Sequence, residues 1–129
     1  MSPFAHIRAI DYTVIHARDL TAMRDFYERV LEFPLERELS ANWLEFRVGA
    51  QILALTQAGA MWGDASPPPG QLSVQLAFRV PTRAVSDCAA ALEAAGITLE
   101  RPVTDHSFGH RTVFFRDPDG NMLEIYAEL

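Results

Sequence analysis

Cysteine is almost absent from this chain of 129 residues, because Cys88 is the only one. A single cysteine cannot form an intrachain disulfide, and it excludes zinc ribbons and cysteine-ligated clusters. Basic residues are also few: 11 Lys and Arg face 17 Asp and Glu, for a formal net charge of −6. Nucleic-acid-binding domains normally carry a basic face, so we expect no nucleic-acid partner.

Long apolar runs are missing as well. No run approaches the roughly 18 apolar residues that a membrane-spanning helix needs. The first six residues (MSPFAH) lack the basic stretch and apolar segment of a signal peptide. We therefore expect no membrane partner and a cytoplasmic location. With 49% hydrophobic and 22% charged residues, the composition is ordinary for a globular domain.

The order of apolar and turn residues predicts the same succession of elements twice. Each half shows a strand, a helix with apolar residues three and four apart, and three further strands. Asp19 and Thr82 are the predicted helix caps, and Gly96 is the predicted end of the second helix. The predicted strands are residues 7–17, 35–39, 43–48 and 51–56 in the first half, and 72–80, 97–103, 111–116 and 121–127 in the second.

A loop separates the two halves. Residues 58–71 (AGAMWGDASPPPGQ) contain three glycines and three consecutive prolines, which exclude a helix or a central strand. We therefore predict a single domain over residues 1–129, built from modules at about 6–57 and 72–128 and a linker at 58–71. The fold class is α+β, with paired βαβββ modules that form an open curled barrel. Its concave face is a natural ligand cleft.

Three stretches resemble the glyoxalase/bleomycin-resistance/extradiol-dioxygenase superfamily, also called vicinal oxygen chelate proteins. They are residues 10–14 (IDYTV) with 18–20 (RDL), 25–31 (DFYERVL) and 115–125 (FRDPDGNMLEI). The resemblance covers nearly the whole chain and implies the paired βαβββ fold and a homodimer. In most enzymes of this superfamily, a divalent metal lies in the cleft and the substrate chelates it through neighbouring oxygens.

The resemblance places the usual metal ligands at Tyr12, Ala54, Gln75 and Glu124. Glu124 matches the superfamily, Gln75 is a weak ligand, a neutral tyrosine is a poor one, and alanine has no ligand atom. Neither a three-ligand zinc site nor an iron facial triad can be assembled from this set. We expect no resident cofactor; if a divalent metal binds, Glu124 and Gln75 are the candidate ligands.

Strand alternation puts Glu124 on one face with Met122 and Tyr126, and the resemblance makes that face the cleft. Tyr12 and His16 share the corresponding face of the first strand. One interpretation makes Glu124 a general base and Tyr12 a donor to a substrate oxygen. The other makes Glu124 a partner in a hydrogen bond that only shapes the cleft. Both interpretations remain open at this point.

Further ligand-binding candidates are side chains that suit an anionic, carbonyl or aromatic group. They are Gln75, His16, Arg79, Arg111, Trp62 and Phe108. For each arginine, a surface position paired with an acid is the alternative, and for His16 the alternative is a solvated position at the end of the strand. His106 and His110, on either side of Phe108, are interpreted as loop residues.

Two functions follow. The first is a glyoxalase/bleomycin-resistance-like protein with a degenerate metal site, which binds an apolar or aromatic small molecule in the cleft. The alternative is a metal-dependent lyase or dioxygenase of the same superfamily that uses Glu124 with Gln75 or a relocated histidine.

Overall fold

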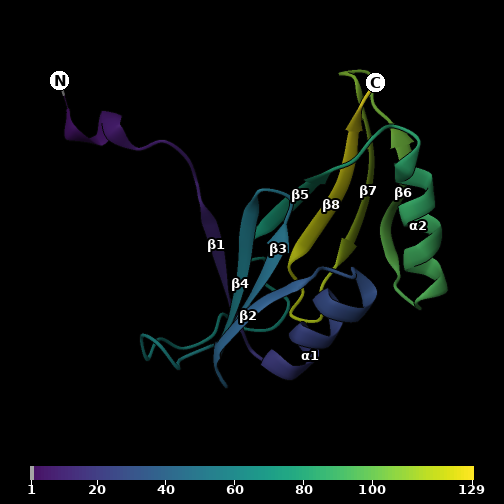
Figure 1. Cartoon of the computed structure of the whole chain (residues 1–129). Helices are drawn as coiled ribbons and strands as arrows, with labels where there is room; N and C mark the ends of the chain where they lie inside the picture. The colour runs from purple at the N-terminus through teal and green to yellow at the C-terminus, as the bar shows by residue number, and fades with distance from the viewer. Residues whose placement is uncertain (1) are drawn as a thin grey trace. The chain divides into compact units, whose positions relative to one another are not determined.

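The computed structural model describes residues 2–129 and divides into two units, one ending at Ser66 and one running from Pro67 to Leu129. Each unit contains a four-stranded sheet and a helix that follows its first strand (Figure 1). The predicted α+β class and the repeated βαβββ order are thereby confirmed. In residues 2–129, no helix has the length and apolar character needed to cross a membrane.

The first unit has the sheet order β1-β4-β3-β2, with β1 parallel to β4. Its elements are η1 (Pro3–His6), β1 (Tyr12–Ala17), α1 (Leu20–Asp25), the π-helical turn η2 (Phe26–Val30), β2 (Leu35–Ser40), β3 (Trp43–Val48) and β4 (Gln51–Gln57). The prediction that the first strand starts at residue 7 was wrong, because residues 7–11 have no strand partner and are exposed.

The helix of the first unit begins as predicted and ends differently. The Asp19 carboxylate accepts a hydrogen bond from the backbone N–H of Ala22 at 3.1 Å, which confirms the cap. The last turn widens: the N–H of Phe33 donates to the carbonyl of Tyr27 at 3.0 Å, six residues earlier. Glu32 takes a φ of +57°, so the chain leaves the helix two residues before Pro34.

Alternation gives the first sheet two different faces. Leu44, Phe46, Leu53 and Leu55 are buried together with Met23 and Tyr27 of the helical segment. This face is the core of the first unit. The opposite face carries Tyr12, Val14 and His16 of β1, Ala54 and Thr56 of β4, and Trp43 and Glu45 of β3.

The second unit repeats this arrangement, with the order β5-β8-β7-β6 and β5 parallel to β8. Its elements are β5 (Gln75–Arg79), α2 (Ala84–Ala94), β6 (Leu99–Asp105), β7 (His110–Arg116) and β8 (Met122–Glu128). Helix α2 contacts β6, β7 and β8 and covers one face of the sheet (Figure 1). The buried side chains beneath it include Val113, Phe115, Leu123 and Ile125.

The predicted cap of α2 was wrong. The Thr82 hydroxyl donates to the carbonyl oxygen of Glu128 at 3.0 Å, so it is committed to the end of β8. The helix begins at Ala84 after Arg83, with no side-chain cap. At the other end, Gly96 has a φ of +81°, which confirms the predicted left-handed glycine.

A buried hydrogen-bonded turn leads into β8. The Asp117 carboxylate accepts the N–H groups of Asp119 and Asn121, both at 3.0 Å, and the side-chain amide of Asn121 at 2.9 Å. The Ser73 hydroxyl donates to the other end of that amide at 2.7 Å. This network joins the segment just before β5 to the turn just before β8, the strand that carries Glu124.

Candidate functional site

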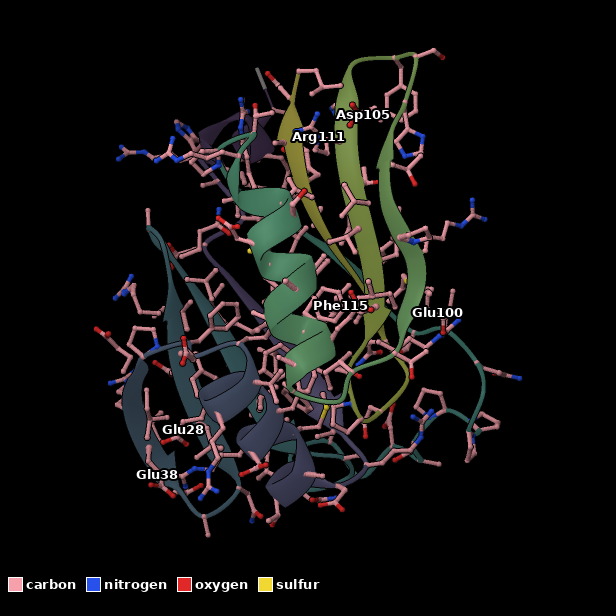
Figure 2. The ribbon with its side chains drawn as sticks, turned by 90° about the vertical axis from the view of Figure 1, so that its right-hand side faces the viewer. Glu28, Glu38, Glu100, Asp105, Arg111 and Phe115 are labelled. Carbon is pink, nitrogen blue, oxygen red and sulfur yellow. The ribbon has the colours of Figure 1, made fainter. Side chains whose placement is uncertain are left out.

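The open face of the second sheet forms a hollow of about 920 Å³. Strand alternation decides which side chains line it: His110, Thr112, Phe114 and Arg116 of β7 do so. Phe115 points to the opposite side, which α2 covers (Figure 2). The hollow is therefore the second unit's counterpart of the cleft face that the sequence predicted.

Glu124 lies at the centre of this face. It is paired with Ala77 of β5 on one side and with Phe114 of β7 on the other. The side chain is partly buried, and within residues 2–129 no hydrogen bond or ion pair engages its carboxylate. Gln75 lines the same hollow from β5. The structure thus brings the predicted residues Glu124 and Gln75 together and leaves the carboxylate available to a ligand.

Four neighbouring rings form one end of the hollow, and we call them the aromatic shelf: His106, Phe108, His110 and Tyr126. Their ring centroids are 5.0 Å apart for His106 and Phe108, 5.2 Å for Phe108 and His110, and 4.9 Å for His110 and Tyr126. Phe108 remains 71% exposed, so its face is accessible. The shelf offers a stacking surface for a flat ligand.

The two histidines of the shelf are held by the turn between β6 and β7. The N–H of His106 donates to the carbonyl of His110 at 2.8 Å, and a ring nitrogen of His106 lies 2.8 Å from the Thr112 hydroxyl. Interpreting both as ordinary loop histidines missed their place in the hollow. Alternation was the available signal, because His110 lies four residues before Phe114 on the same face.

Charged side chains of β6 and β7 complete the lining. Arg116 donates to the carboxylate of Glu100 on β6 at 2.7 Å (Figure 2) and to the carbonyl of Gly120 at 2.8 Å. Arg101 also lines the hollow, and it makes no hydrogen bond or ion pair within residues 2–129. Sequence reasoning missed Glu100 and Arg101 because the register of β6 shifts between Leu99 and Arg101. Alternation does not foresee such a bulge.

The two predicted arginines lie outside the hollow. Arg111 projects from the other face of β7 and donates to both carboxylate oxygens of Asp105, at 2.6 and 3.0 Å (Figure 2). These bonds raise the pKa of Arg111 and lower the pKa of Asp105. Arg79, at the end of β5, lies 3.0 Å from Glu128. For both residues the structure shows the alternative, pairing with a surface acid.

Tyr12, His16 and Trp62 lie in the first unit. Tyr12 is 56% exposed on β1, and His16 lies four residues further along the strand on the same face. Trp62 is 73% exposed in the loop after β4. A joint role of Tyr12 with Glu124, and ligand binding by His16 and Trp62, stay predictions.

The first unit contains a carboxylate that sequence reasoning missed. Glu45 of β3 is the strand partner of Ala54, and Ala54 is one of the positions where the resemblance places a usual metal ligand. Its side chain is only 12% exposed. The Trp43 indole N–H donates to it at 2.7 Å and Arg37 at 2.9 Å, and these bonds lower the pKa of Glu45. Glu45 is thus committed to protein donors.

The side chains within residues 2–129 do not assemble a site with three metal ligands from His, Cys, Asp or Glu. The hollow offers two carboxylates, Glu124 and Glu100, and one amide, Gln75; Glu100 is already paired with Arg116 at 2.7 Å. His110 is paired with Glu128, four residues from Glu124, which is about 13 Å along the strand. This donor set does not fit a zinc site or a facial triad.

Residues 9–125 match the model of the Glyoxalase/Bleomycin resistance protein/Dioxygenase superfamily. The chain is 30% identical over 122 residues to virulence protein STM3117 of Salmonella typhimurium, covering 92% of this chain and 83% of that protein.

Two solved structures are similar over most of their length. Lactoylglutathione lyase from Agrobacterium tumefaciens is 27% identical with a TM-score of 0.77, over 95% of both chains. A glyoxalase/bleomycin resistance protein/dioxygenase from Nocardioides is 24% identical with a TM-score of 0.82, over 95% of this chain and 85% of that one, and it supports the fold alone. The chain belongs to the Glyoxalase/Bleomycin resistance protein/Dioxygenase superfamily.

Proposed function

We propose that this protein binds an apolar or aromatic small molecule in the hollow of its second unit and has a degenerate metal site. The observation that carries the proposal is the accessible aromatic shelf beside the unpaired carboxylate of Glu124. A volume of about 920 Å³ falls in the range of small-molecule pockets. The homodimer and the cytoplasmic location that the sequence suggests stay predictions.

The lining supplies both affinity and orientation. A ligand ring stacked on Phe108 or Tyr126 gains about 0.5–1.5 kcal/mol per aromatic pair beyond the burial of its area. Glu124 is partly buried between Ala77 and Phe114, so its carboxylate has lost part of its hydration. A ligand N–H or O–H that reaches the carboxylate replaces those lost water contacts. The pocket therefore favours a flat molecule that carries a hydrogen-bond donor.

Thermal unfolding with a panel of aromatic compounds tests this proposal. A ligand at 100 times its Kd stabilises the folded state by about 2.7 kcal/mol, which is readily seen as a rise in Tm. We expect Phe108→Ala to weaken binding about tenfold, whereas Phe4→Ala, which removes an exposed ring of the first unit, leaves it unchanged. Equal binding by Phe108→Ala, or no stabilisation by any compound, would overturn the proposal.

A metal-dependent lyase or dioxygenase is the second candidate. It is favoured by Glu124 at the superfamily's ligand position and by the similarity to a lactoylglutathione lyase. This function needs Gln75 or a relocated histidine to complete the metal site. Stoichiometric metal in protein purified without chelator, together with turnover of a hemithioacetal or catechol that a chelator abolishes, would establish it instead.

A further inference from the structure

Two opposite charges lie in one row across the hollow, with an aromatic ring between them. The strand register aligns Glu124 of β8 with Phe114 of β7, and Phe114 with Arg101 of β6. All three side chains line the hollow. Ala77 of β5 continues the row on the other side of Glu124 and leaves that side without bulk.

Glu124 and Arg101 are not joined to each other. Neighbouring strands lie about 4.8 Å apart, so the two residues are separated by about 10 Å across β7. Neither forms an ion pair or hydrogen bond within the part of the chain that is described, residues 2–129. The other two charges of the lining, Glu100 and Arg116, already bind each other at 2.7 Å. Glu124 and Arg101 are therefore the charges that remain for a ligand.

We infer that the hollow selects a dipolar ligand: a small molecule with an ammonium group at one end, a carboxylate at the other and a flat body between them. This inference rests on the proposed function and adds the chemical class of the ligand. The ammonium binds Glu124, the carboxylate binds the fork of the Arg101 guanidinium, and the flat body lies against Phe114. Orientation is fixed because reversing the ligand would place like charges together.

The probe for this inference is 4-(aminomethyl)benzoate, whose two charges lie at opposite ends of a benzene ring. Benzylamine and benzoate each keep one charge, and 4-methylbenzyl alcohol keeps neither. Isothermal titration calorimetry at low salt measures all four. We expect the dipolar probe to bind about tenfold or more tightly than either singly charged compound, because each charge-assisted contact contributes a factor of that order.

Two variants give a crossed pattern that a structural defect would not produce. Glu124→Gln is expected to weaken the dipolar probe and benzylamine about tenfold and to leave benzoate unchanged. Arg101→Gln is expected to weaken the dipolar probe and benzoate and to leave benzylamine unchanged. Matched controls are Glu93→Gln on the exposed side of α2 and Arg83→Gln before that helix, which lie outside the lining and should alter no affinity.

The outcomes separate this inference from the proposed function. Equal binding of the neutral and dipolar compounds, unaffected by either variant, would overturn the dipolar ligand while leaving an aromatic binding site in place. Uniform weakening of all four compounds by Glu124→Gln would overturn it as well. If none of the four compounds binds and the wider aromatic panel also fails, the proposed function falls and the dipolar ligand falls with it.

Discussion

Replacing Asp117 with alanine should destabilise the second unit strongly. Asp117 is only 4% exposed, and its carboxylate accepts hydrogen bonds of 2.9–3.0 Å from the backbone N–H groups of Asp119 and Asn121 and from the Asn121 amide. A hydrogen bond to a charged group is worth about 1.5–3 kcal/mol, but bonds that share one acceptor are not additive. Removing it also leaves buried donors of Asn121 without an acceptor. We therefore expect Asp117→Ala to cost about 3–5 kcal/mol.

Urea unfolding followed by circular dichroism measures this cost, with Asp64→Ala in the exposed loop of the first unit as the matched control. The control should shift the free energy of unfolding by less than about 0.5 kcal/mol. A double-mutant cycle with Asn121→Ala should show coupling, because the two side chains share a bond. A cost below about 1 kcal/mol for Asp117→Ala, or no coupling, would refute the claim that this turn fixes the start of β8.

Three further predictions concern other parts of the chain. Glu45→Gln should lower the free energy of unfolding by about 1–2 kcal/mol at neutral pH, because it removes the charge that accepts the Trp43 and Arg37 bonds. The cost stays small because Arg37 is largely exposed and solvent screens its bond. Trp43 and Arg37 lower the pKa of Glu45 in the folded state, so its stabilisation is present above the ordinary pKa of about 4.3 and is lost as pH falls through the folded value. The urea midpoints of wild type and variant should therefore converge as the pH falls from about 6 to about 3. Parallel curves would contradict a lowered pKa of Glu45 in the folded state. Burial raises the pKa of the Cys88 thiol, so its reaction with a thiol reagent at neutral pH should be slower than that of free cysteine, and a faster reaction would count against a packed thiol. Gly109→Ala should cost about 1 kcal/mol and weaken aromatic ligands, since Gly109 has a φ of +97° in the turn that carries Phe108, and unchanged stability and affinity would argue against that constraint.

The repeated elements were accessible from the sequence because local signals agree with the fold. The Asp19 cap, the left-handed Gly96 and the buried alternation around Phe46 are each encoded within a few residues. The predicted helix cap at Thr82 was wrong because the partner of this side chain is distant in the sequence. Its hydroxyl bonds a carbonyl 46 residues away, and no local pattern reports such a partner.

The hollow was only partly predictable. Alternation correctly grouped Glu124 with Tyr126, because β8 is regular from end to end. Arg101 escaped notice because a register shift in β6 overrides alternation. Glu45 escaped notice because its guanidinium donor, Arg37, reaches it only when β2 pairs with β3. Arg111 lies outside the hollow because alternation along β7 puts it on the face opposite to His110 and Thr112, where it binds Asp105.

An amide-resolved NMR titration with an aromatic ligand tests the central claim most directly. The account predicts that the largest shifts fall on the aromatic shelf and on the strand positions around Glu124, with smaller shifts at Glu45 in the first unit. Shifts centred on Glu45 or Tyr12, with the shelf unaffected, would contradict the assignment of the binding site to the hollow of the second unit.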